Sequence, residues 1–136
     1  MIRIPDISAT TLPNECFDNA FSNCINITTA MKLPAMNIEQ RCYVYMFAGC
    51  TSLITIPKLP ATQLQSECYA GMFFNCKSLK FSETQTDECP NPYRIPSEGI
   101  GIAADYATID MFRGTSGTFT GTPEINKTYY TNATVI

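Results

Sequence analysis

Hydrophobic residues recur along this chain with a period of 26 residues. Written in blocks of 26, residues 4–29, 30–55 and 56–81 align without a gap, and apolar residues fall in the same columns. These columns include Cys16, Cys42 and Cys68; Phe21, Phe47 and Phe73; Cys24, Cys50 and Cys76; and Ile27, Leu53 and Leu79. The period predicts a repeat array in which each unit buries its apolar face against its neighbours.

A fourth, degenerate repeat is predicted at residues 95–117. Ile95 precedes Phe112 by 17 residues, as Ile56 precedes Phe73, so residues 82–94 are predicted to be an inserted loop. Residues 118–136 carry Thr, Tyr and Val around a Gly-Thr-Pro turn, which predicts a β-rich C-terminal cap. We therefore expect residues 1–136 to form a single domain.

The spacing within one repeat predicts one short helix and one short strand. Leu64, Cys68, Met72 and Cys76 follow one another at intervals of four, which favours the apolar face of a helix of about ten residues. Leu53, Ile56 and Leu59 then recur every three residues before Pro60, which suits a short extended segment at a corner. The expected fold class is an α/β repeat with a β-rich C-terminal cap.

The motif C-Y-x-x-M-F-x-x-C-x-S-L stands at residues 42–53 and again at residues 68–79. It resembles the 26-residue bacterial surface-protein repeat of the BspA-like leucine-rich repeat family. The runs at residues 59–64 and 117–123 are also similar to repeat proteins of this family from gut Bacteroidales and from the phages that infect them. The resemblance implies a short right-handed leucine-rich-repeat-like solenoid. It also implies an adhesion or recognition module, or a component of a phage particle, and it carries over no catalytic residues.

Composition excludes several classes of function. The chain has no histidine, which removes Ser-His and Cys-His nucleophile pairs and imidazole metal ligands. Its net charge of −3 gives no basic surface for nucleic acid. No stretch of 18 apolar residues occurs, and the first residues show no signal-peptide pattern, so we expect neither membrane insertion nor export by this chain alone.

Six of the seven cysteines form two columns of the repeat. We interpret them as buried structural thiols that stack on their own copies and offer a weak S–H donor to the turn backbone; a disulfide or metal ladder is the alternative. They are Cys16, Cys24, Cys42, Cys50, Cys68 and Cys76. The seventh, Cys89, lies in the inserted loop and is interpreted as inert, with a disulfide to a repeat cysteine as the alternative.

Six of the twelve acidic residues lie between positions 83 and 110. The D-x-D-x-D-G spacing of a calcium loop is absent, so we interpret this stretch as a solvated acidic loop. We expect no metal and no cofactor. A small glycan-acting enzyme that uses a pair of these carboxylates remains a remote alternative.

Binding is expected at variable and aromatic positions on the surface of the stack. The predicted partner-binding residues are Thr28, Tyr45, Ile54, Phe74, Lys80, Phe81, Tyr129 and Tyr130. Ile4, Ile7 and Leu12 would lie at an open N-terminal end, which we expect a second copy of the chain or another protein to cover.

Taken together, these features predict a non-enzymatic protein-recognition or structural module. The leading hypothesis is an exposed phage virion component that acts in assembly or in contact with a host-surface glycan or protein. The alternative is a domain of a bacterial cell-surface adhesin, located at the cell surface or secreted as part of a larger protein.

Overall fold

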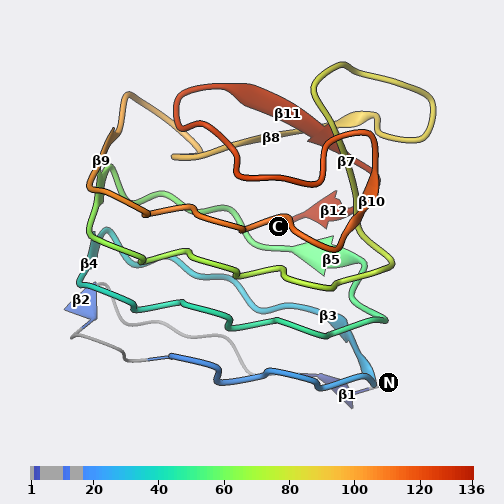
Figure 1. The fold of residues 1–136 in the computed structure, drawn as a ribbon, viewed down its shortest axis with the longest axis horizontal. Helices are drawn as coiled ribbons and strands as arrows, with labels where there is room; N and C mark the ends of the chain where they lie inside the picture. The colour runs from blue at the N-terminus through green and yellow to red at the C-terminus, as the bar shows by residue number, and fades with distance from the viewer. Residues whose placement is uncertain (1, 4–10, 13–16) are drawn as a thin grey trace.

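The computed structural model describes residues 2–3, 11–12 and 17–136 of this chain. In Figure 1 the chain winds from the N-terminus through successive stacked coils to a cap that contains β7, β8, β10 and β11. The described strands are β1 (Ile2–Arg3), β2 (Thr11–Leu12), β3 (Ile27–Thr29), β4 (Asn37–Ile38), β5 (Thr55–Ile56), β6 (Gln63–Leu64), β7 (Lys80–Ser82), β8 (Asn91–Arg94), β9 (Ile102–Ala103), β10 (Ser116–Gly117), β11 (Thr128–Thr131) and β12 (Thr134–Val135).

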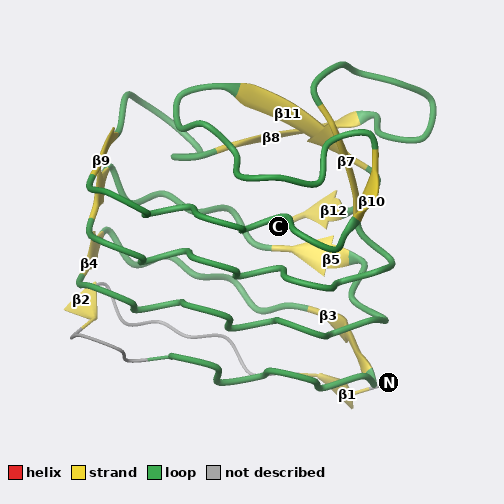
Figure 2. Ribbon diagram, viewed as in Figure 1, coloured by secondary structure: helices red, strands yellow, loops and turns green. Residues whose placement is uncertain are grey.

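The strands of the coils lie at two edges of the stack, joined by turns and loops (Figure 2). At one edge the order is β1-β3-β5-β12, with all pairs parallel. At the other edge β2 pairs with β4 and β6 with β9, again in parallel. The cap sheet is mixed, in the order β10-β7-β11-β8, and β11 runs antiparallel to both of its neighbours.

Four segments of consecutive turns cross the described part of the stack between these edges. We call them row 1 (17–24), row 2 (41–50), row 3 (65–76) and row 4 (104–115). Along a row, backbone N–H groups alternate between two acceptors. The N–H of Met46 donates to the carbonyl of Tyr43 three residues earlier (3.1 Å), whereas the N–H of Tyr45 donates to Ala70 in row 3 (2.9 Å). Successive N–H groups along a row therefore bond alternately to a carbonyl of their own row and to a carbonyl of the next row.

The predicted α/β solenoid is wrong: the described residues contain no α-helix, and the fold is all-β with mixed strand pairing. The rows occupy the positions where helices were expected. Every fourth residue of a row has a positive φ, as at Arg41 (56°), Tyr45 (52°) and Gly49 (75°) in row 2. An α-helix needs a φ near −63° at every residue, so this backbone cannot be helical.

The interval of four residues explains both the expectation and its failure. In an α-helix, side chains four residues apart drift by about 40° per step around the axis. In row 3 one set of buried residues, Cys68, Met72 and Cys76, keeps an interval of four, because the turns themselves repeat every four residues. Leu64 at the end of β6 precedes Cys68 by four residues and is buried as well.

The core of the stack consists of columns in which equivalent side chains lie above one another. Phe47 and Phe73 are stacked with ring centroids 6.0 Å apart, and Tyr43 and Tyr69 with centroids 5.8 Å apart. Row 1 contributes Phe21 and Phe17 to the same two columns. Each coil therefore buries its aromatic rings against the next, as the 26-residue period predicts.

Candidate functional site

A groove crosses the outward-facing side of rows 1, 2 and 3, and we call it the Tyr45 groove. Its volume is about 330 Å³. It is lined by Asn19, Ser22, Asn23, Tyr45, Ala48, Gly49, Phe74 and Asn75. These residues supply amide, hydroxyl and aromatic groups without a charged side chain, a lining that suits a neutral ligand.

Tyr45 of row 2 and Phe74 of row 3 form the aromatic side of the groove. Their rings meet edge to face, with centroids 6.1 Å apart. Tyr45 is 37% exposed. The ring of Tyr45 lies over Gly71, where any side chain would collide with it. Tyr45 and Phe74 were both predicted as partner-binding residues, and the structure brings them together in one groove.

Asn23 and Asn75 form the amide part of the groove, and the sequence prediction missed both. Both have positive φ (62° and 60°), which asparagine tolerates better than most residues. Each lies against a glycine of the next row, Asn23 against Gly49 and Asn75 against Gly114. Their side-chain amides make no hydrogen bond within the described part of the chain, so they are available to a ligand. The alternation of Asn and Gly in this column was the signal that could have revealed them.

Thr28, Ile54 and Lys80 lie away from the Tyr45 groove. Ile54 is 52% exposed, and its N–H donates to the carbonyl of Thr28 (2.9 Å). The C-terminal segment separates Ile54 from Lys80, because Thr134 donates to the Ile54 carbonyl and Asn132 bonds the backbone of Lys80. The three positions therefore do not form one continuous binding surface.

Two residues predicted to be exposed anchors are buried, and the prediction is wrong for them. Phe81 is fully buried and stacks on Phe112 with ring centroids 3.8 Å apart. Tyr129 is buried against Phe119, and its hydroxyl accepts a hydrogen bond from the N–H of Glu124. Both lie where the cap packs on the last coil. Tyr130, on β11, is partly buried.

Ile4 and Ile7 of the predicted N-terminal end lie outside the described residues, and so does Cys16, one of the predicted structural thiols. Leu12 belongs to β2, where its backbone pairs with Ile38 of β4.

The repeat cysteines of rows 2 and 3 are free thiols buried in the stack. They are Cys42, Cys50, Cys68 and Cys76, whereas Cys24 of row 1 is partly buried. The thiols of Cys50 and Cys76 donate to the carbonyls of Phe21 (3.1 Å) and Phe47 (3.0 Å) in the preceding row. Burial raises the pKa of Cys68 and of Cys76 to about 12. These thiols therefore act in packing and in a weak hydrogen bond between rows.

Cys89 is also a free thiol, but it is buried although it lies in the inserted segment. Its N–H donates to the hydroxyl of Thr86, and its carbonyl accepts from the N–H of Thr86. This local turn folds Cys89 inward.

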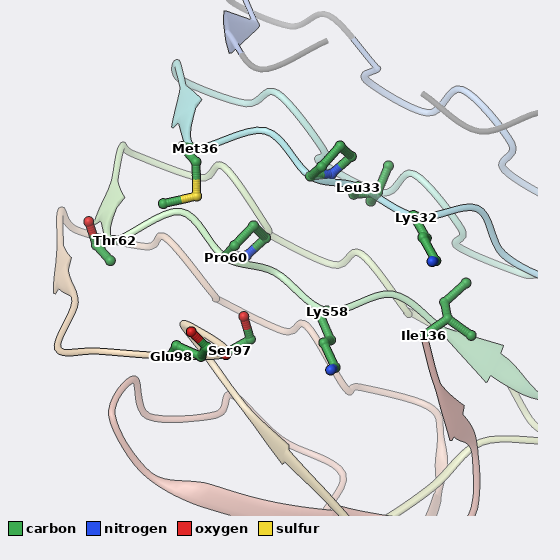
Figure 3. A pocket seen from close by; sticks show the side chains of 10 residues that line it. Lys32, Leu33, Met36, Lys58, Pro60, Thr62, Ser97, Glu98 and Ile136 are labelled. Carbon is green, nitrogen blue, oxygen red and sulfur yellow. The ribbon is translucent and has the colours of Figure 1, made fainter. Parts of the chain in front are cut away.

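A second hollow, the Lys58 groove, lies on another side of the coils (Figure 3). Its volume is about 430 Å³. It is lined by Lys32, Leu33, Pro34, Met36, Lys58, Pro60, Thr62, Ser97, Glu98 and Ile136. The sequence prediction missed this groove. The recurrence of Lys32 and Pro34 as Lys58 and Pro60 was a signal for its two sides, but the position of Ile136 depends on the return of β12.

No protein-family model, curated protein or solved structure matches this chain. The described residues also include no helix long and apolar enough to cross a membrane.

Proposed function

We propose that this protein is a non-enzymatic recognition module that binds a neutral, hydroxyl-rich surface glycan through the Tyr45 groove. One observation carries the proposal: Tyr45 and Phe74 meet in a groove whose remaining polar groups are the amides and hydroxyl of Asn19, Ser22, Asn23 and Asn75. An aromatic ring packs against the C–H face of a sugar, and amide groups exchange hydrogen bonds with its hydroxyls.

Rigidity supports this use of the groove. The backbone on its floor is held by bonds between rows, including the N–H of Asn23 to Ala48 (2.6 Å) and that of Gly49 to Phe74 (2.7 Å). A preorganised surface loses little conformational entropy when a ligand binds. Groups from three successive rows can therefore contact successive parts of one extended ligand.

The binding test compares two tyrosine variants on a glycan array and by calorimetry with each glycan that the wild type binds. Tyr45→Ala should weaken binding roughly tenfold, equivalent to about 1.4 kcal/mol. Tyr106→Ala is the matched control, because Tyr106 is an exposed tyrosine with positive φ in row 4, outside the groove. Equal affinity of the two variants, or a wild type that binds none of the neutral glycans, would refute the proposal.

We further propose that the module is exposed on a phage particle and contacts the host surface. The resemblance of residues 59–64 and 117–123 to repeat proteins from phages of gut Bacteroidales supports this setting. Immunogold labelling with an antibody to the chain should decorate purified particles. Labelling confined to the bacterial envelope would instead favour an adhesin.

A further inference from the structure

We propose that the outer edge of row 1 binds another polypeptide, which presents a row of backbone N–H groups to it. The edge consists of the carbonyl oxygens of Asp18, Ala20 and Ser22, and we call it the acceptor edge. The acceptor edge shares Ser22 with the Tyr45 groove, but it uses the backbone carbonyl of Ser22 and includes neither Tyr45 nor Phe74, so either proposal can fail without the other.

The polarity of the stack defines the acceptor edge. Each row donates N–H groups to the carbonyls of the next: Asn19 to Val44, Tyr45 to Ala70, and Gly71 to Ile109, all at 2.9 Å. The carbonyl that corresponds to Val44 and Ala70 in row 1 is that of Asp18. The carbonyls of Asp18, Ala20 and Ser22 accept no hydrogen bond in the part of the chain that the structure describes.

The opposite end of the stack is closed. In row 4, the N–H of Asp110 donates to the Thr122 hydroxyl (2.9 Å) and that of Phe112 to the Gly121 carbonyl (3.2 Å). The Thr108 hydroxyl donates to the carbonyl of Pro123 (2.8 Å), which holds the same loop in place. The cap loop, residues 120–125, therefore occupies the two central N–H donors, Asp110 and Phe112, of those that a further row would use.

The columns of core side chains also stop at row 1, where no further row covers them in the described part of the chain. Ala20 is exposed, whereas the equivalent residues Met46, Met72 and Met111 are fully buried. Phe17 and Phe21 end the two aromatic columns and are only partly buried. A further row would continue these columns at their spacing of about 6 Å, as between Phe21 and Phe47 (5.9 Å).

These features identify the partner as a turn row with open N–H donors rather than a second copy of this chain. Two copies in a symmetric dimer would oppose carbonyls with carbonyls. A head-to-tail contact would need row 4, whose Asp110 and Phe112 N–H groups the cap loop occupies. The partner must therefore present free N–H groups at alternate residues, with apolar side chains over Ala20 and Phe21.

The test exposes the N–H donors of row 4 by removing the cap loop and uses the resulting variant as the probe. In the uncapped variant, a Gly-Ser linker of equal length replaces residues 120–125. By sedimentation velocity, the wild type should be monomeric, whereas the uncapped variant should form species larger than a dimer that increase with concentration. Excess wild type should shorten them to dimers, because its acceptor edge binds the open donors and its own cap stops growth.

Ala20→Arg in the otherwise wild-type chain is the matched control, since it places a charge at the centre of the acceptor edge. This variant should fail to shorten the polymers. Equal shortening by Ala20→Arg, self-association of the wild type, or an uncapped variant that stays monomeric while rows 2 and 3 remain protected from hydrogen exchange would overturn the proposal. If the uncapped variant does not fold, the pair Thr108→Val and Thr122→Val loosens the loop without replacing it, and the same outcomes decide.

Discussion

The thiols of rows 2 and 3 show how single residues adapt to this stack. Cysteine is small enough to recur in one column, and its S–H group reaches the carbonyl of the preceding row at Cys50 and Cys76. Burial holds these thiols in the protonated form, because the charged thiolate is poorly solvated in the core.

The raised thiol pKa values predict that the protein loses stability in mild alkali. An unfolded cysteine has a pKa near 8.5, whereas burial raises the pKa of Cys68 and of Cys76 in the folded chain to about 12. The folded state therefore binds more protons than the unfolded state above pH 8.5, so stability falls as the pH rises through this window. Each such thiol steepens the fall by up to about 1.4 kcal/mol per pH unit.

Urea unfolding between pH 7 and pH 10 measures this effect. Cys68→Ala should give a shallower fall than the wild type. Met72→Ala, which also removes buried side-chain volume but no titratable group, should keep the wild-type slope. A wild-type free energy of unfolding that stays constant from pH 8 to pH 10 would contradict the buried-thiol assignment.

At the scale of an element, the row depends on residues that accept positive φ every fourth position. Gly49 has a φ of 75°, and Asn23 of the preceding row occupies the space that a side chain would need. Gly99 has nearly the same φ (76°) but open space around it. Alanine substitutions at these two glycines therefore separate the cost of backbone strain from the cost of steric collision.

Gly49→Ala should destabilise the protein by about 1–3 kcal/mol and more than Gly99→Ala, which adds only the backbone strain. Thermal unfolding of both variants measures the difference. Asn23→Gly should restore part of the loss in Gly49→Ala, because it clears the amide from that space and glycine tolerates the positive φ of position 23. Identical losses at Gly49 and Gly99 would mean that Asn23 does not pack against Gly49.

The element scale is also where sequence reasoning failed. The columns of the repeat were readable because buried residues recur every 26 positions. The interval of four at Leu64, Cys68 and Met72 was interpreted as a helix face. Gly71 and Asn75, which are also four residues apart, instead favour turns. Local apolar spacing carries no information on whether an N–H bonds within its segment or to a residue 25 positions away, as Tyr45 does.

At the scale of the whole molecule, long-range packing determines the features that the sequence patterns did not predict. Phe81 and Tyr129 resembled surface anchors, but the cap folds over the last coil and buries both. Tyr45 and Phe74 were predictable because they occupy outward positions of rows that stack directly. The Lys58 groove needs the return of β12 beside β5, which no pattern in the repeat predicts. The resemblance to a surface-protein repeat family stays a prediction.

The stack of turn rows underlies both proposals, since it builds the Tyr45 groove and gives row 1 its acceptor edge. NMR detection of scalar couplings across hydrogen bonds tests this arrangement most directly. The amide nitrogen of Tyr45 should correlate with the carbonyl carbon of Ala70, 25 residues away. A correlation of the same nitrogen with the carbonyl carbon of Arg41, the helical partner four residues earlier, would contradict the stack.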